Sequence, residues 1–118
     1  MSYYDGFVAA VPVANKDTYA QHAQKAWDDM FKGMGALSMT ETWADDVPEG
    51  EVTSFPMAVK RKDDEAVVFS WVEWPDKATR DGAWAKMMEM GPGAMDEMPF
   101  DGKRMIYGGF APIVTCRA

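Results

Sequence analysis

Residues 67–74, Val-Val-Phe-Ser-Trp-Val-Glu-Trp, followed at once by Pro75 and Asp76, decide the fold of this chain. The eight residues are rich in β-branched and aromatic side chains, and their nearly continuous apolar character is typical of a strand inside a sheet. Proline has no N–H to donate to a sheet, so the strand is expected to end at Pro75. Asp76 can act as an N-cap, and a helix is therefore expected to follow.

The sequence after Asp76 predicts one helix and one last strand. The helix is amphipathic, with apolar residues at Ala83, Trp84, Met87 and Met90. Gly91-Pro92-Gly93 is expected to end it, residues 94–103 to form a loop, and residues 104–114 to form the last strand. The pair Gly108-Gly109 in that strand indicates a bulge or a close backbone approach.

The first third of the chain predicts a strand, a helix and a second strand. Residues 3–11 are rich in aromatic and β-branched residues and form the first strand. Asn15 can cap a helix that Gly33 and Gly35 end. Its apolar stripe is Tyr19, Ala23, Ala26, Trp27, Met30 and Met34. Residues 37–44 then alternate as a strand does. One face of that strand carries Leu37, Met39, Glu41 and Trp43.

The region between the second strand and the central strand gives weaker signals. Residues 45–56 contain two prolines and several acids and predict a long loop. Residues 55–60 fit either a short strand or a turn. Lys60-Arg61-Lys62 is the basic run of the chain, and acids follow it directly, which is typical of a solvated turn.

The element order predicts an α+β domain spanning residues 1–118, with a ferredoxin-like β-α-β-β-α-β arrangement and an antiparallel sheet. Two helices then cover one face of the sheet. The first, third and fourth strands carry apolar residues on both faces, so the other face also needs cover. A second copy of the chain is the simplest cover, because two-fold dimers are the commonest oligomers. We therefore expect a homodimer.

Composition limits the partners and the chemistry. The chain has 118 residues, 47% of them hydrophobic, and a formal net charge of −7, which disfavours binding to nucleic acid. No run approaches the roughly 20 apolar residues of a membrane span, and the start of the sequence lacks signal-peptide features, so a cytoplasmic location is expected. One cysteine, Cys116, and one histidine, His22, do not make a metal cluster, and no cofactor motif is present.

Five segments carry a resemblance to a known family. They are Tyr3–Pro12, Ala44–Pro48, Phe55–Lys60, Val67–Trp71 and Met98–Phe110. On these segments the chain resembles the YbaA-like family of uncharacterised bacterial proteins, within the dimeric α/β-barrel superfamily. The resemblance implies a ferredoxin-like subunit whose sheet packs on that of its partner, and it implies no particular activity.

Arg80 is the most informative candidate for a ligand site. It lies one turn before Trp84 on the apolar stripe of the second helix, and a guanidinium stays charged, so it needs an anion or water. Arg80 can be structural, bent to solvent or paired with an acid such as Glu41, Glu73 or Asp81. Alternatively, it clamps the carboxylate of a ligand at the mouth of a pocket.

The other candidates have two interpretations each. Trp71 and Trp84 fit core packing or the wall of a pocket between helices and sheet. His22, at the edge of the first helix's apolar stripe, is a surface residue or a general base. Lys103 and Arg104 begin the last strand, or they close over an anionic ligand together with Lys60.

Two functions remain open from the sequence. One is a small-molecule-binding or cofactor-free enzymatic homodimer, whose pocket between helices and sheet accepts a small apolar or aromatic acid. The other is a non-catalytic dimeric structural or interaction module. A well-formed pocket favours the first, and a tightly filled core favours the second.

Overall fold

The computed structural model describes residues 1–90 and 98–118 of the chain. Its strands are β1 (Tyr3–Pro12), β2 (Ser38–Trp43), β3 (Glu65–Trp74) and β4 (Ile106–Phe110). Its helices are α1 (Lys16–Ala26), α2 (Phe55–Ala58) and α3 (Lys77–Glu89). The strands form one antiparallel sheet in the order β2-β3-β1-β4. The protein is thus of the α+β class, and β3 is a central strand as its sequence predicts.

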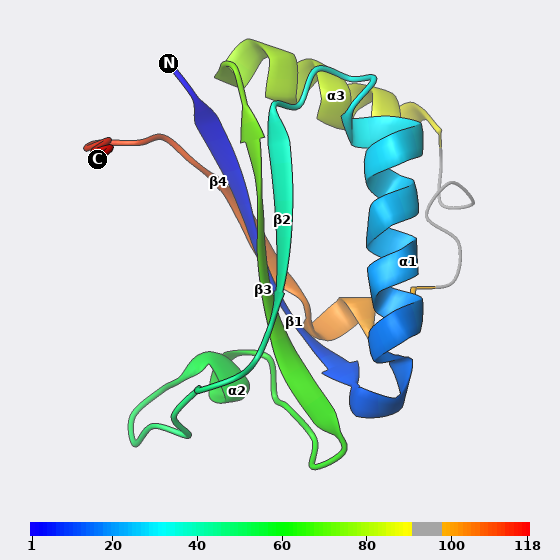
Figure 1. Ribbon diagram of the computed structural model, residues 1–118, viewed down its shortest axis with the longest axis vertical. Coiled ribbons are helices and arrows are strands. Elements are labelled where there is room, and N and C mark those ends of the chain that lie inside the picture. The colour runs from blue at the N-terminus through cyan, green and yellow to red at the C-terminus, as the bar shows by residue number, and fades with distance from the viewer. Residues whose placement is uncertain (91–97) are drawn as a thin grey trace.

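The two long helices lie on the same side of the sheet, and α2 with its flanking loops lies at one end of it (Figure 1). α1 continues into a π-helical turn, Trp27–Phe31, which extends the same helical rod. Within the described residues, no helix has the length and apolar character needed to cross a bilayer.

The helix starts differ in how they are capped. Asp76 caps α3 as predicted, because its carboxylate accepts the backbone N–H of Thr79 at 2.7 Å. Asn15 occupies the N-cap position of α1 as predicted, but its side chain makes no capping hydrogen bond. The Asn15 side chain instead donates to the carbonyl oxygen of Pro99 at 2.9 Å, and a 3₁₀ turn leads into the helix. A contact distant in sequence therefore replaces the local cap.

Residues 55–60 form neither a strand nor a simple turn. Ser54 caps the short helix α2 by accepting the backbone N–H of Met57 at 3.1 Å. Proline at the second position of α2 suits the first turn of a helix, where its missing N–H has no intrahelical partner. Ser54 followed by Phe55 and Pro56 thus favours a helix start, which strand and turn propensities did not reveal.

The last strand is shorter than residues 104–114. It runs over Ile106–Phe110 and pairs with β1 from Val8 back to Tyr4, so it runs out of partner near the start of β1. Before it, Asp101 accepts the backbone N–H of Lys103 and fixes a 3₁₀ turn. Gly109 pairs in regular register and forms no bulge, but a Cβ there would lie 2.5 Å from Tyr3 Oη. The predicted close approach is confirmed.

The two faces of the sheet are covered unequally. The core under α1 and α3 includes Val11, Val68, Val72, Trp74, Ala83 and Met87, and a separate buried cluster of Val8, Ala10, Val59 and Val67 lies on the opposite face next to the α2 segment. On the opposite face, which neither long helix covers, Phe69, Ile106 and Phe110 are 45%, 46% and 62% exposed. We call this second surface the open face of the sheet.

Candidate functional site

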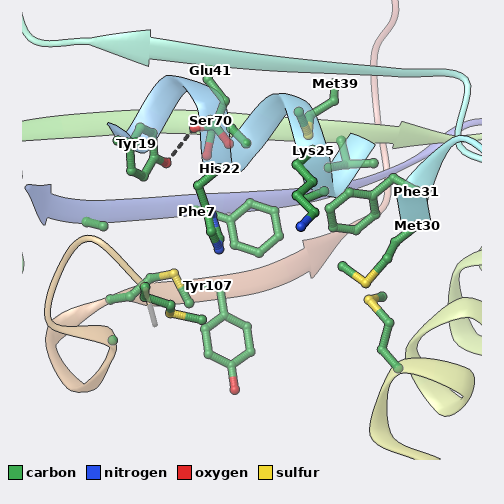
Figure 2. A pocket seen from close by; sticks show the side chains of 18 of the residues that line it. Phe7, Tyr19, His22, Lys25, Met30, Phe31, Met39, Glu41, Ser70 and Tyr107 are labelled. Atoms are coloured by element: carbon green, nitrogen blue, oxygen red, sulfur yellow. Dashed lines mark hydrogen bonds between the residues drawn. The ribbon is translucent and has the colours of Figure 1, made fainter. Parts of the chain in front are cut away.

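A pocket of about 740 Å³ lies between α1, α3 and the sheet face that the helices cover. Its walls are largely apolar and combine residues from both helices and several strands (Figure 2). They include Phe7, Ala23, Ala26, Phe31, Val68, Val72, Trp84, Phe100 and Tyr107. A site of this size and character is of the kind that holds a small organic molecule.

Methionine side chains make up much of the remaining wall. Those that line the pocket are Met30, Met39, Met87, Met88, Met90, Met98 and Met105. Unbranched thioethers have several rotatable bonds and pack against surfaces of different shape. The wall is therefore able to adjust to the outline of a ligand.

A carboxyl group and two hydroxyl groups meet on the sheet side of the pocket. Glu41 of β2 accepts a hydrogen bond from Tyr19 Oη of α1 at 2.6 Å. Ser70 of β3 is opposite Glu41 in the sheet register and is 2% exposed. Figure 2 shows the three side chains together at one end of the pocket. Strand alternation explains the position of Glu41, since Met39, two residues earlier, also lines the pocket.

The surroundings of these groups change their protonation. Desolvation by the surrounding protein raises the pKa of Glu41, although the hydrogen bond from Tyr19 and the neighbouring Ser70 lower it in part. Burial also raises the pKa of Tyr19, and the nearby charge of Glu41 adds to this effect. Tyr19 is therefore the proton donor of the pair at neutral pH. In the described part of the chain, no cation lies within ion-pair distance of Glu41.

Further polar residues line the pocket from α1. His22 follows Tyr19 by one turn and contributes the imidazole. Lys25 and Asp29 follow at the next turns and are exposed residues of the pocket rim. The same helix face thus carries a phenol, an imidazole and an amine in succession.

Arg80 is held by a different carboxylate. Its guanidinium binds Asp5, with Nη2 to Oδ1 at 2.8 Å and Nε to Oδ1 at 3.1 Å. Asp5 is 2% exposed, and it also accepts the indole N–H groups of Trp74 and Trp84, each at 2.9 Å. Asp81 binds the other end of the guanidinium at 3.0 Å. Asp81 is one of the partners expected from the sequence, and Asp5 is not.

Arg104 is held in the same way at the other end of the sheet. Glu65, which is 7% exposed, accepts both Nη atoms of Arg104 at 2.6 and 2.8 Å, and Asp101 accepts Nε at 3.0 Å. This pairing lowers the pKa of Glu65 to about 2. The carbonyl oxygen of Lys60 accepts Arg104 Nη1 at 2.9 Å. The arginine therefore anchors the start of β4 to the segment after α2.

The structure divides the candidates from the sequence into two groups. His22, Trp84 and Trp71 border the pocket. The ring of Trp71 lies 5.4 Å from that of Phe69 on the open face. Trp71 therefore borders the pocket with atoms other than its ring, because side chains alternate between the two faces of a strand. The charged candidates Arg80, Lys60, Lys103 and Arg104 are not among the lining residues in the described part of the chain.

The comparisons with known proteins agree with one another. The family model "Protein of unknown function (DUF1428)" matches residues 2–102. The chain belongs to the DUF1428 family. This DUF1428 chain is 54% identical over 120 residues to the "Uncharacterized protein YbaA" of Escherichia coli strain K12, with 97% of this chain and 98% of that one covered. The protein of the same name from Shigella flexneri matches equally well. The resemblance to a YbaA-like bacterial family is confirmed.

One solved structure supports the fold. It is a dimeric ferredoxin-like protein from an uncultured marine organism, which matches with a TM-score of 0.59 and 11% identity over the full length of both chains. At that identity the likeness establishes the ferredoxin-like fold of the DUF1428 chain and nothing about its activity.

The sequence patterns do not predict the polar end of the pocket. They place Tyr19 on the apolar stripe of α1 and offer Glu41 only as a partner of an arginine. The signal was present, because Glu41 alternates with Met39 and Trp43 on the apolar face of its strand. A carboxylate in a row of apolar residues is costly to bury unless it is paired with a cation or protonated, so its presence indicates a functional role when neither is evident. Among residues 1–90 and 98–118, no group of three or more His, Cys, Asp or Glu residues is arranged for a metal ion.

Proposed function

We propose that the protein is a homodimer that binds a small, largely apolar or aromatic molecule in the pocket between its helices and its sheet. Each ferredoxin-like β-α-β-β-α-β subunit contributes one pocket, and the two sheets pack together as in a dimeric α/β barrel. The observation that supports the binding role most strongly is the apolar pocket with the Tyr19–Glu41 pair at one end. A purely structural module has no use for such a cavity, because filled interiors are more stable.

The polar end of the pocket selects the ligand class. Glu41 has no cation beside it in the described part of the chain, so a ligand carboxylate placed there meets a like charge. Arg80, the expected carboxylate clamp, is engaged by Asp5 and Asp81. The geometry therefore favours a neutral ligand with a hydroxyl or N–H group that donates to Glu41, in place of the acid that the sequence favoured.

The open face supports the homodimer. Phe69, Ile106 and Phe110 lie on it as partly exposed apolar residues, and the ring of Phe55 packs 5.7 Å from that of Phe69. Apolar surfaces of this kind mark protein interfaces. The fold neighbour is described as dimeric, which agrees with this proposal. Sedimentation at micromolar concentration is expected to give twice the chain mass of 13.1 kDa, and a monomer would contradict the dimer.

Calorimetric titration with 2-naphthol tests the binding site. This probe has an aromatic body and one hydroxyl donor. Ala26→Phe places a ring in the pocket and is expected to abolish binding, because Ala26 lines it. Ala20→Phe is the matched control on the exposed side of α1 and is expected to bind as wild type.

The matched ligand 2-naphthoate tests the ligand class. We expect it to bind more weakly than 2-naphthol by about 1.5–3 kcal/mol, the usual contribution of a hydrogen bond to a charged group. Absence of binding by either ligand, or equal binding in Ala26→Phe, would favour the interaction module instead.

A further inference from the structure

We propose that the pocket is a cofactor-free proton-transfer site, in which Glu41 removes a proton from a carbon next to the carbonyl group of an apolar or aromatic ketone. This inference rests on the proposed binding function and adds a reaction to it. It starts from three features of the same pocket: a carboxyl group on the wall, a hydroxyl that fixes one of its oxygens, and apolar surroundings.

The geometry gives Glu41 one fixed and one free oxygen. Tyr19 Oη donates to Oε1 at 2.6 Å, which orients the carboxylate across the gap between α1 and β2. Within the described residues no second hydrogen bond of ordinary length reaches Glu41, although the hydroxyl of the neighbouring Ser70 lies close enough to lower its pKa. Because Glu41 lines the pocket, its second oxygen, Oε2, is the one available to a ligand. Tyr19 is a positioning residue in this account, and Glu41 is the catalytic one.

Glu41 is an exposed residue of the edge strand β2, and its partial desolvation at the pocket makes the carboxylate a stronger base than a fully solvated one. Desolvation raises the pKa of Glu41, and a base is most effective when its pKa approaches the working pH. Such a shift at a cleft is a recognised mark of an acid–base residue. The apolar wall, including Phe7 and Trp84, gives a bound substrate largely apolar surroundings.

The proton transfer needs no second reactant. The carbon–hydrogen bond breaks, its proton passes to Glu41 Oε2, and its electron pair forms a carbon–carbon double bond as the carbonyl oxygen becomes an enolate. Return of a proton from Glu41 to the same carbon, or to a conjugated one, completes an exchange or an isomerisation. Because the Tyr19 proton is committed to Glu41, the donors left for the enolate oxygen are other lining groups, among them His22, Lys25 and the hydroxyl of Tyr107.

The groups that face Glu41 define the expected pH dependence. The groups that line the pocket with Glu41 are Tyr19, His22 and Lys25 of α1, Asp29 of the turn after it, Tyr107 of β4 and the uncharged Ser70 of β3. Exchange is expected to rise with pH as Glu41 ionises, and the midpoint reports its pKa. The hydrogen bond from Tyr19 lowers the pKa of Glu41, so Tyr19→Phe is expected to move this midpoint to higher pH.

Hydrogen–deuterium exchange of 2-tetralone tests the inference. This bicyclic aromatic ketone has acidic protons between its ring and its carbonyl, and their replacement in D₂O is followed by NMR. Wild type is expected to accelerate the exchange over buffer. Glu41→Gln retains the shape of the side chain and can still accept from Tyr19, so it is expected to bind 2-tetralone within about threefold of wild type. Its exchange rate is expected to fall at least about 100-fold, the lower end for loss of a general base.

The outcomes separate the two proposals. Calorimetric binding of 2-tetralone without exchange, or exchange that persists in Glu41→Gln, would overturn the proton-transfer role and leave the binding function intact. If neither 2-tetralone nor 2-naphthol binds, the binding function is wrong, and this inference is wrong with it. An unmoved pH midpoint in Tyr19→Phe would overturn the positioning role of Tyr19.

Discussion

Two carboxylates on the helix-covered side of the sheet have opposite surroundings. Asp5 of β1 is 2% exposed and is surrounded by the guanidinium of Arg80 and two indole N–H groups. Glu41 of β2, an edge strand, faces a pocket and receives a hydrogen bond from the neutral hydroxyl of Tyr19. The sites differ in what balances the negative charge: a cation at Asp5 and hydroxyl groups at Glu41.

This difference indicates that the Asp5 site stabilises the fold, whereas the Glu41 site is the candidate for function. A buried charge with a cation and matched donors joins elements that are far apart in sequence, here β1 and α3. A carboxyl group without a cation retains a raised pKa, and it is poised to exchange a proton or to accept a ligand donor. In the sequence, Arg80 stands out as a functional candidate because it is a charged residue on an apolar stripe. Its position is explained by Asp5, which also lies among apolar residues.

The largest loss of stability is expected when the Asp5 site loses its cation. Arg80→Met keeps much of the packing of the stem but leaves Asp5 buried without a cation. Unfolding free energy is expected to fall by about 3–5 kcal/mol, the usual result of removing one partner of a buried ion pair. Chemical denaturation measures it. Unchanged or increased stability would show that Arg80 is kept for ligand binding at a cost in stability. The Asp5 site would then be the functional one.

A smaller loss of stability is expected when an added side chain at Gly109 crowds the Asp5 site. A Cβ at Gly109 would lie 2.5 Å from Tyr3 Oη and 2.8 Å from Arg80 Nη2, so Gly109→Ala must displace either Arg80, which binds Asp5, or Tyr3, whose ring packs against the Arg80 guanidinium. We expect a loss of about 1–3 kcal/mol, the usual cost of overpacking. Gly108→Ala is the matched control in the same strand, because its Cβ would make ordinary contacts of 3.6 Å with Phe110. Equal losses in both variants would show that the strand, and not the Asp5 site, is sensitive.

The smallest effect on stability is expected at the pocket. Glu41→Gln removes the charge, keeps an acceptor for Tyr19, and is expected to leave stability unchanged or to raise it by up to about 1 kcal/mol at neutral pH. The pH dependence gives the sign. Because the pKa of folded Glu41 is raised, wild type has its full relative stability below the ordinary glutamate pKa and loses it as pH rises through the raised value.

The difference in unfolding free energy between Glu41→Gln and wild type should therefore grow from acid to neutral pH. Glu65, whose pKa is lowered to about 2, is present in both proteins, so its loss of stability in acid cancels in this difference. A difference that shrinks as pH rises would mean that the ionised form of Glu41 stabilises the fold.

The sequence predicted the fold better than the site, for a physical reason. Side-chain periodicity fixes strands and helices locally, so the central strand, the Asp76 cap and the two long helices could be predicted. The end of β4 could not, because it depends on where its partner β1 begins. The short helix α2 depends on a cap and a proline that propensity treats as a turn.

The site depends on partners that are distant in sequence. Nothing local connects Arg80 to Asp5, 75 positions earlier, or Tyr19 to Glu41 on another element. The pattern did place an acid on the apolar face of residues 37–44, and the strand alternation was sufficient to mark Glu41 as unusual. The pocket itself follows from how the helices sit on the sheet, which no local pattern encodes.

Carbon-detected NMR titration of the Glu41 carboxyl group, with and without 2-naphthol, tests the central claim most directly. The account predicts that this carboxyl titrates above the ordinary range of glutamate in the free protein, and that 2-naphthol shifts its resonance while leaving that of Asp5 in place. If Glu41 titrates with the surface glutamates and does not respond to 2-naphthol, the pocket carboxyl is an ordinary side chain of an edge strand and the functional assignment is wrong.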